Sequence, residues 1–436
     1  MKTNAAAVSL AVMAWAGWVQ AADWPQWRGI NRDGHVPAGE KGLTNLPVEI
    51  KPRWRIDVGE GFASPVVVGA ADAGRIYYID LQDGKEVVHA AEASSGRELW
   101  QTPLDTAFKD DWGQGPRCTP VIDGQRVFVQ SCRGELQCLD AETGKMQWRK
   151  NYVQDFGAVF MGETGPAAGA TRHGNTGPPV VDGEQLIAQV GGVQGASLVC
   201  FNKATGEVVW RSQDDTAGNA APVMAALGGV RQVISFTALG LIGLDAGNGT
   251  LFWRVPLKTR LGRHVTTPVV VDDLVIVGSY QVGLVAVKVI REGATFRAEP
   301  AWTNKEVASN FASPVAAGDY VYGVGPRKNV YCVEARTGKL AWSQTGLIRG
   351  AGDGGFASFI VMGKRILMLS DSGELVLFAT NPAQFEAAGR TQVCGLTWCT
   401  PAYADGRLYV RDAKALVCLD LSPSAVAEEF TGDAAK

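Results

Sequence analysis

The sequence carries little charge and almost no excess of either sign. Only 19% of its 436 residues are Asp, Glu, Lys or Arg, and the formal net charge is −3. A protein that binds phosphate groups needs a basic field, so this balance argues against a nucleic-acid partner. Lys and Arg are also scattered along the chain, which leaves no polybasic segment for an anionic membrane surface.

Motifs that carry well-known chemistry are also absent. The sequence has no Walker-type phosphate loop, no H-E-x-x-H zinc motif and no recognisable Ser-His-Asp arrangement. It has no C-x-x-C-H haem attachment site, and no dense run of Asp and Asn that would give a hard cation its converging oxygens. No motif therefore marks the chain as an enzyme.

Long apolar runs are absent except at the start. Lys2 is followed by a nearly unbroken apolar run over 5–19 and by small residues at 19–21, which predicts a signal peptide over 1–21. We expect a soluble periplasmic or secreted protein that begins near Ala22 and is not membrane-embedded; a retained N-terminal anchor is the alternative. Because the first cysteine is Cys118, we expect no lipid anchor on an N-terminal Cys.

The eight cysteines fall into two groups. Four precede an acidic or amide turn residue at equivalent places in a repeat, so we expect them to be small buried apolar residues: Cys138, Cys200, Cys332 and Cys418. The other four form two candidate disulfides whose formation the sequence leaves open: Cys118 with Cys132 across a hairpin, and Cys394 with Cys399 around a small loop.

Glycine and tryptophan, in contrast, recur in a fixed pattern. Five times an Asp, Glu or Asn stands four residues before a Gly, and a Trp stands four residues after that Gly: Glu92 to Trp100, Asp140 to Trp148, Asn202 to Trp210, Asp245 to Trp253 and Glu334 to Trp342. The Gly gives a hairpin turn the positive φ that other residues adopt only with strain. The Trp offers a flat apolar surface that can cover the joint with a neighbouring sheet.

A second sequence feature, a proline at the start of an apolar run, recurs along the chain together with the Gly and Trp pattern. A proline opens an apolar run at seven places, and Ser358 opens a degenerate eighth: Pro65, Pro120, Pro179, Pro222, Pro268, Pro314 and Pro401. Each unit then reads as four short strands, which predicts an all-β, eight-bladed β-propeller of four-stranded antiparallel blades.

The last unit supplies only three strands, whereas residues 49–59, with Trp54, supply a lone strand before the first marker. We therefore expect the N-terminal strand to complete the last blade and close the ring, with an open solenoid as the alternative. The predicted organisation is a signal peptide over 1–21, an N-terminal extension over 22–49, the propeller over 50–421 and a flexible tail over 422–436. We expect a monomer.

The "DAETGKMQW" turn at 140–148 and its copies resemble the tryptophan-docking motif of pyrroloquinoline-quinone-type propellers. The resemblance covers about residues 50–421 and is weak in the blades that end near Trp302 and Arg390. The opening "DWPQWRGINRDG" at 23–34 is similar to that of many secreted bacterial propellers of this group. The group includes quinone-dependent alcohol dehydrogenases and the lipoprotein propeller of outer-membrane barrel assembly, so the fold alone leaves function open.

The resemblance implies three functional classes. Dehydrogenases of this group stack pyrroloquinoline quinone (PQQ) between a Trp and a disulfide of adjacent Cys, and hold Ca²⁺ with Glu, Asn and Asp. This chain has no Cys-Cys dipeptide, so no cofactor is predicted, and PQQ with Ca²⁺ is the alternative. An outer-membrane assembly role is a second alternative, against which the missing lipidation Cys counts. The favoured hypothesis is a non-catalytic binding or scaffold propeller whose protein partner or small polar ligand is unknown.

The connections from a Trp to the next Pro-led strand indicate where binding occurs. Five are 11 to 16 residues long, whereas Trp100 to Pro120 spans 20 and Trp148 to Pro179 spans 31. We expect these two loops to form a flap over one side of the central funnel, although a surface insertion without function is the alternative.

Residues just before each inner strand should rim that funnel, with donors, one carboxylate and an aromatic ring that suit a polar or anionic ligand: Arg117, His173, Asn175, Asn219, Arg263, His264, Asn310, Asp353 and Trp398. Polar residues at these places are also what a water-filled channel requires. No metal site is predicted, because two His without a third ligand do not form one.

Overall fold

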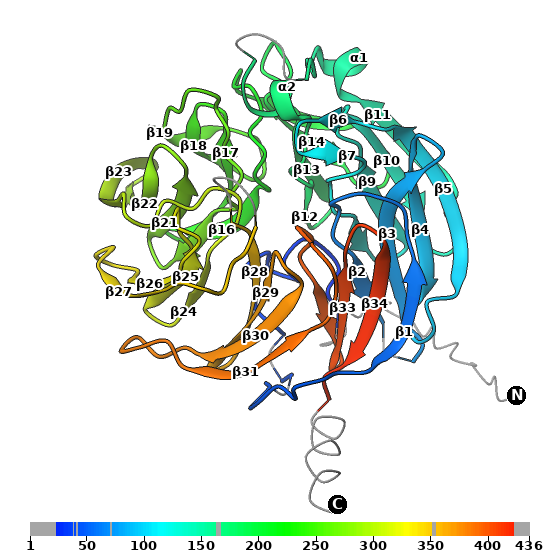
Figure 1. The fold of residues 1–436 in the computed structure, drawn as a ribbon. Helices are drawn as coiled ribbons and strands as arrows, with labels where there is room; N and C mark the ends of the chain where they lie inside the picture. The colour runs from blue at the N-terminus through cyan, green and yellow to red at the C-terminus, as the bar shows by residue number, and fades with distance from the viewer. Residues whose placement is uncertain are drawn as a thin grey trace, which may run out of the picture.

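The computed structural model describes residues 23–37, 39–40, 42–69, 72–162, 167–350 and 355–422. These residues form eight four-stranded antiparallel sheets arranged as blades in a ring (Figure 1), and we call the region that their inner strands surround the channel. The predicted eight-bladed propeller is therefore confirmed. The predicted signal peptide and almost all of the predicted C-terminal tail lie outside the described residues.

Each blade is named here by its place in the chain. From the channel outward, blade 1 contains β2 Val66–Val68, β3 Arg75–Gln82, β4 Lys85–Glu92 and β5 Glu98–Thr106, and blade 2 contains β8 Val121–Asp123, β9 Arg126–Gln130, β10 Glu135–Asp140 and β11 Met146–Asn151. Blade 3 contains β12 Val180–Asp182, β13 Gln185–Gln189, β14 Leu198–Asn202 and β15 Val208–Ser212, and blade 4 contains β16 Val223–Leu227, β17 Val230–Thr237, β18 Gly240–Asp245 and β19 Leu251–Pro256. Seven of the eight inner strands begin directly after a proline, since Pro lacks the N–H that a ladder position needs, and β28 in blade 7 begins next to the substitute Ser358.

Blade 5 contains β20 Val269–Val271, β21 Leu274–Ser279, β22 Gly283–Glu292 and β23 Thr295–Asn304, and blade 6 contains β24 Val315–Ala317, β25 Tyr320–Val324, β26 Val330–Glu334 and β27 Leu340–Gln344. Blade 7 contains β28 Ala357–Met362, β29 Arg365–Ser370, β30 Glu374–Ala379 and β31 Ala387–Gln392, and blade 8 contains β32 Ala402–Ala404, β33 Arg407–Arg411, β34 Ala415–Asp420 and β1 Pro52–Asp57. The remaining elements lie in the two long loops: β6 Lys109–Asp110, β7 Gly113–Gln114, α1 Tyr152–Phe156 and α2 Gly169–His173.

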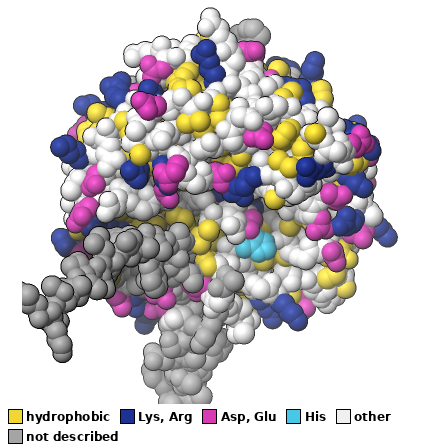
Figure 2. Space-filling view, turned by 180° about the vertical axis from the view of Figure 1, so that it is seen from behind, with side chains coloured by type: hydrophobic (Ala, Val, Ile, Leu, Met, Phe, Trp, Pro, Cys, Tyr) yellow, Lys and Arg dark blue, Asp and Glu magenta, His cyan; other side chains and the backbone are white. Residues whose placement is uncertain are grey.

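The outer surface mixes charges of both signs. On the face shown in Figure 2, Lys and Arg side chains lie among Asp and Glu, so no field of a single sign covers it. Within the described part of the chain, no helix has the length and apolarity needed to cross a membrane.

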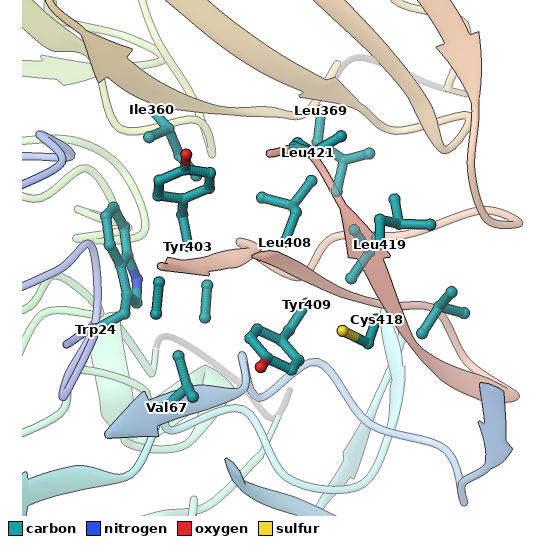
Figure 3. Close-up of a cluster of buried hydrophobic side chains, with 14 of the residues drawn as sticks. Trp24, Val67, Ile360, Leu369, Tyr403, Leu408, Tyr409, Cys418, Leu419 and Leu421 are labelled. Atoms are coloured by element: carbon teal, nitrogen blue, oxygen red, sulfur yellow. The ribbon is translucent and has the colours of Figure 1, made fainter. Parts of the chain in front are cut away.

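The N-terminal strand closes the ring. β1 pairs antiparallel with β34, with Trp54 opposite Cys418 and Asp57 opposite Ala415. Blade 8 is thus built from both ends of the chain, as the split repeat predicts. The cluster of buried side chains around this blade also contains Trp24, which Figure 3 shows beside Tyr403 of β32. Closure therefore joins the N-terminal region to the last blade through apolar burial as well as backbone pairing.

The repeated Trp residues join six of the eight blades to the blade that follows. Six indole N–H groups donate to a backbone carbonyl of the following blade at 2.8–3.2 Å: Trp54 to Ala93, Trp100 to Ala141, Trp148 to Lys203, Trp210 to Ala246, Trp302 to Ala335 and Trp342 to Asn381. Five of these rings also lie on the turn Gly of that blade, where an added Cβ would come within 2.4–2.9 Å of the ring: Gly96, Gly144, Gly206, Gly249 and Gly338. The turn Gly is therefore required twice, for its positive φ and for the missing side chain.

Trp253 does not donate to the following blade. Blade 5 has no Asp-x-x-x-Gly turn, and its outer strands β22 and β23 extend to ten residues each. The indole of Trp253 donates instead to Gln232 Oε1 at 2.8 Å, within its own blade. The weakness of the repeat near Trp302 thus reflects a local change in how two blades meet.

The N-terminal extension crosses one end of the channel. Residues 23–37 run from blade 1 to blade 7: Trp24 pairs with Val67 of β2, and His35 forms a parallel bridge with Val361 of β28. In Figure 1 this dark-blue segment lies behind the inner strands. The sequence gives no indication that the extension plugs the channel, because the composition of residues 23–37 does not specify which other part of the chain they contact.

Two buried arginines fix this plug, which we define as residues 23–37. Arg28 donates to the carbonyl of Pro314 at 2.6 Å. Arg32 donates to the carbonyls of Pro178, Pro179 and Pro222. Both arginines have positive φ values, 62° and 61°, a conformation that costs free energy and persists only when surrounding contacts hold it. The plug is therefore held by hydrogen bonds from charged guanidinium groups to backbone carbonyl groups that are not paired within the inner strands.

Candidate functional site

The opposite end of the channel is covered by the first long loop. After β5, the loop turns through the small hairpin of β6 and β7 and places Trp112 at its tip. The indole of Trp112 lies 5.1 Å, centroid to centroid, from Phe311 between blades 5 and 6, and 5.6 Å from Trp398 between blades 7 and 8. The loop therefore reaches across the channel mouth, and we call residues 107–117 the flap.

Beneath the flap lies a cavity of about 160 Å³. Its lining is mostly apolar and comes from connections that precede the inner strands, together with the plug residue Trp27: Trp27, Phe62, Trp112, Arg117, Thr119, His173, Thr176, Pro178, Asn219, Ala221, Arg263, Val265, Thr267, Phe311, Phe356 and Trp398. We call this cavity the flap pocket. It is bounded by the flap on the outside and by the plug on the inside.

Arg117 holds the flap in place. Its guanidinium donates to both carboxylate oxygens of Asp110, at 2.6 Å to Oδ2, and His173 Nδ1 lies 3.5 Å from the same carboxylate. Burial alone would raise the pKa of Asp110, but hydrogen bonds from Arg117 and His173 hold it well below its usual range. Because His173 belongs to α2 in the second long loop, its contact with Asp110 also joins the two long loops. Such a contact is expected if both loops form one flap.

Arg263 lies among aromatic rings. Its guanidinium carbon is 4.4 Å from the ring centroid of Tyr280, 5.0 Å from that of Phe311 and 5.9 Å from that of Trp112. Its Nη2 donates to Oδ1 of Asn310 at 3.2 Å. Asn310 is therefore a partner of a pocket residue and does not itself line the pocket. A cation over ring faces is attracted to their negative π surface.

Three of the predicted rim residues are buried in the channel wall. Asn175 is fully buried and donates to the carbonyl of Gln189 at 2.7 Å. Asn219 lines the pocket but is only 7% exposed, and its Nδ2 donates to the carbonyl of Gly174. His264 is fully buried against Phe236, and burial lowers its pKa to about 3. Asn175 and His264 therefore support the wall rather than face a ligand.

Five of the nine predicted residues line the flap pocket: Arg117, His173, Asn219, Arg263 and Trp398. The predicted carboxylate, Asp353, lies outside the described residues. What the sequence prediction missed is the aromatic character of the site, supplied by Phe62, Trp112, Phe311 and Phe356 in addition to Trp398. These aromatic residues are visible in the sequence, within the connections that precede the inner strands. Nothing in the sequence shows, however, that connections far apart in the chain meet over one cavity.

The two candidate disulfides are not formed. All eight cysteines are free and buried, and burial raises the pKa of both the Cys118 and Cys132 thiols. Both thiols lie in the wall as neutral apolar groups, because burial outweighs the charges of Arg32 and Arg117, which would favour the reactive thiolate. The four cysteines at equivalent repeat positions are buried as expected.

The pocket does not fit PQQ with Ca²⁺. No Cys, Asp or Glu is among its described lining residues, so it offers neither the disulfide face nor the carboxylate ligands that the resemblance implies. No group of three or more His, Cys, Asp or Glu side chains that could hold a metal occurs in the described ranges.

The sequence also matches a protein-family model. The model described as outer membrane protein assembly factor BamB matches residues 51–167 and 84–344, which together cover more than half of the chain. The chain belongs to this family. It is 26% identical over 285 residues to the outer membrane protein assembly factor BamB of Yersinia pestis, a match that covers 61% of this chain and 63% of that protein. The match thus spans less than two thirds of the Yersinia protein.

Two solved structures share the fold. The BamB structure from Moraxella catarrhalis superposes with a TM-score of 0.57 at 16% identity, covering 86% of this chain and 98% of that one. The quinohemoprotein alcohol dehydrogenase ADHIIG from Pseudomonas putida HK5 gives a TM-score of 0.57 at 12% identity, covering 92% of this chain and 80% of that one. At such identities the likeness shows the fold alone. The chain is a PQQ-like propeller similar to BamB.

Proposed function

We propose that this protein is an exported, non-catalytic scaffold propeller that binds a protein partner at the flap end of its channel, in a role like that of an outer-membrane assembly factor. The observation that carries the proposal is the flap pocket. An aromatic cavity under a loop that spans the channel mouth is the kind of concave apolar site that binds ligands.

Two further features support binding at this end. The second long loop exposes apolar side chains beside the mouth, with Val159 and Met161 50% and 59% exposed. Leu396, in the connection that carries Trp398, is 75% exposed. Aromatic and Met residues are enriched where proteins meet, since they bury large apolar areas with few unsatisfied polar groups.

The test is photo-crosslinking from single positions in the full-length protein within the bacterial envelope. A benzoylphenylalanine probe replaces Met161 or Leu396 at the flap end, or replaces Met146 or Val209 on outer strands as matched controls, which are 46% and 50% exposed. We expect defined protein adducts from the flap-end positions alone, and mass spectrometry should identify them as envelope proteins.

Two outcomes would overturn the proposal. Equal labelling from the four positions would show that the flap end is not a specific binding surface. Robust quinone-dependent dye reduction by the purified protein with alcohols or sugars would show that it is an enzyme.

A further inference from the structure

The size of the flap pocket limits what it can hold. Its volume is about 160 Å³, and an engineered apolar cavity of about 150 Å³ in another protein binds one benzene molecule. With the flap closed, the pocket therefore accommodates a single six-membered aromatic ring with a small substituent.

The walls of the pocket are suited to such a ring. Phe311 and Trp398 are stacked with their centroids 5.5 Å apart, and Phe62 and Phe356 lie 6.0 and 6.4 Å from Trp398. Aromatic rings pair favourably at these separations in offset or edge-on arrangements, which adds to the free energy of apolar burial. A ring that enters the pocket therefore meets partners of its own kind.

One buried acceptor in the lining lacks a partner. Asn219 is only 7% exposed, and its Nδ2 donates to the carbonyl of Gly174 at 3.0 Å, which orients the amide. Its Oδ1 is buried and accepts no hydrogen bond from a described residue. An amide oxygen can only accept, and a buried acceptor without a donor costs free energy. An occupant that carries a hydrogen-bond donor is therefore favoured.

The two arginines of the lining are already engaged. Arg117 donates to both carboxylate oxygens of Asp110. Arg263 donates to Asn310 and lies over aromatic rings. Neither guanidinium group therefore requires an anionic occupant, and a neutral ring with one donor matches the lining.

The mouth of the pocket favours a polypeptide as the source of this ring. Trp112 is 40% exposed, and no described residue accepts from its indole N–H. A chain segment that crosses the mouth offers backbone carbonyl groups to this donor, because each residue carries one. The exposed side chains of Met161 and Leu396 extend the apolar surface beyond the pocket, over an area that a small molecule does not cover.

We infer that the flap pocket binds the tyrosine side chain of a partner polypeptide. The phenol ring packs against Phe311 and Trp398, and its hydroxyl donates to Oδ1 of Asn219. Tyrosine combines a single six-membered ring with an O–H donor and stays neutral up to about pH 10, whereas phenylalanine has no donor and the ring system of tryptophan is larger. This inference rests on the proposed function and specifies the group that the partner supplies.

Titration calorimetry tests the inference with three probes. These are a blocked pentapeptide with tyrosine at the centre of four glycines, the same peptide with phenylalanine, and 4-methylphenol. We expect the tyrosine peptide to bind about tenfold more tightly than the phenylalanine peptide, a difference of about 1.4 kcal/mol. It should also bind more tightly than 4-methylphenol, which has no backbone to pair with Trp112.

The acceptor is tested by a matched pair of variants. Asn219→Ala should remove the preference for tyrosine over phenylalanine. Asn175→Ala should leave the preference unchanged, because Asn175 also has a buried Oδ1 without a described partner but does not line the pocket. Circular dichroism melting curves confirm that each variant is folded.

A second pair tests the pocket without changing its buried wall. Trp112→Ala, at the exposed flap tip, should weaken binding of the tyrosine peptide about tenfold, as expected for an aromatic residue at the centre of a binding site. Met146→Ala removes a similarly exposed apolar side chain on an outer strand and should not weaken binding. This pair decides the question even if Asn219→Ala does not fold.

Each outcome supports or overturns the inference. Equal affinity for the two peptides, a preference that survives in Asn219→Ala, or unchanged binding in Trp112→Ala would overturn it. Binding of 4-methylphenol as tight as that of the tyrosine peptide would replace the polypeptide with a free phenol. If the tyrosine peptide binds but no flap-end crosslinks form, the proposed scaffold function fails. If crosslinks form but the tyrosine peptide does not bind, only this inference fails.

Discussion

The two ends of the channel differ in how their hydrogen-bond donors are paired. At one end, the plug arginines Arg28 and Arg32 are fully buried and donate to proline carbonyls of blades 3, 4 and 6. At the other end, no described residue accepts a hydrogen bond from the indole N–H groups of Trp112 and Trp398, which line the flap pocket. The comparison teaches that buried donors are directed onto carbonyl groups where the chain binds itself, with Arg28 Nη1 as an exception, whereas indole donors remain available where the chain faces the outside.

Trp27 links these two ends. It belongs to the plug, yet its ring forms part of the lining of the flap pocket, and its indole N–H donates to Oγ1 of Thr267 at 2.9 Å. The plug thus supports the binding site from within, since its position sets the depth of the cavity.

The largest expected effect comes from removing the N-terminal contribution. Deletion of residues 22–58 removes the plug and β1, exposes the edge of β34 and leaves blade 8 without its outer strand. We expect the loss of a cooperative thermal transition, measured by circular dichroism. Deletion of residues 423–436 is the matched control and should keep the melting temperature near that of the full chain. Similar melting temperatures for the two truncations would contradict the role of the plug and β1 in closure.

A point substitution at each end sharpens the comparison. Arg32→Met leaves buried carbonyls of blades 3 and 4 without their donor, at about 1–3 kcal/mol for each unsatisfied group. We expect a loss of about 3 kcal/mol or more in the free energy of unfolding, measured by urea denaturation. Trp112→Ala at the exposed flap tip should cost about 1 kcal/mol or less. If both cost the same, the plug end is no more stabilising than the flap end.

The smallest expected effect concerns pH and the base of the flap. Glu86 of β4 is fully buried opposite Asp105, and burial, followed by the charge of Asp105, raises its pKa to about 8. The neighbouring cations Arg117 and Arg133 act in the opposite direction. A carboxyl whose pKa is raised by folding contributes stability below its unfolded pKa of about 4.5, and that contribution is lost as the pH rises through about 8.

We therefore expect the melting temperature of the wild-type protein to fall by a few degrees between pH 6 and pH 9. In Glu86→Gln, which has no charge to bury, this decrease should be smaller, and at pH 9 the variant should be the more stable of the two. A decrease of the same size in both proteins would show that Glu86 does not ionise over this range. Arg297→Gln, on the outer part of blade 5, is the control for a general charge effect.

Much of the ring was predictable because it follows from local rules repeated eight times. A positive φ at the turn Gly, a Pro where no ladder N–H is needed, and alternating apolar residues act within a few residues of one another. The missing acceptor turn in blade 5 was also visible in the sequence, but the redirection of Trp253 onto Gln232 was not. Contacts between a side chain and its own blade depend on packing that no short pattern specifies.

The site was predictable only in outline. Five of the rim residues line the pocket because every connection before an inner strand ends at the same mouth. Asn175 and His264 stand at the same kind of sequence position, yet they are fully buried, Asn175 beside Gln189 of β13 and His264 against Phe236 of β17. Exposure depends on what other segments cover, and this is a property of the whole fold.

The amino-acid sequence by itself determined the number of blades, the order of their strands and the closure by β1, since each rests on hydrogen-bond and side-chain patterns within or between adjacent repeats. Only the tertiary structure decided that residues 23–37 plug the channel, that Trp112 reaches Phe311 and Trp398, and that aromatic rings form the pocket. The physical reason is that a ring brings together residues hundreds of positions apart, and loop closure costs little extra free energy as the sequence separation grows.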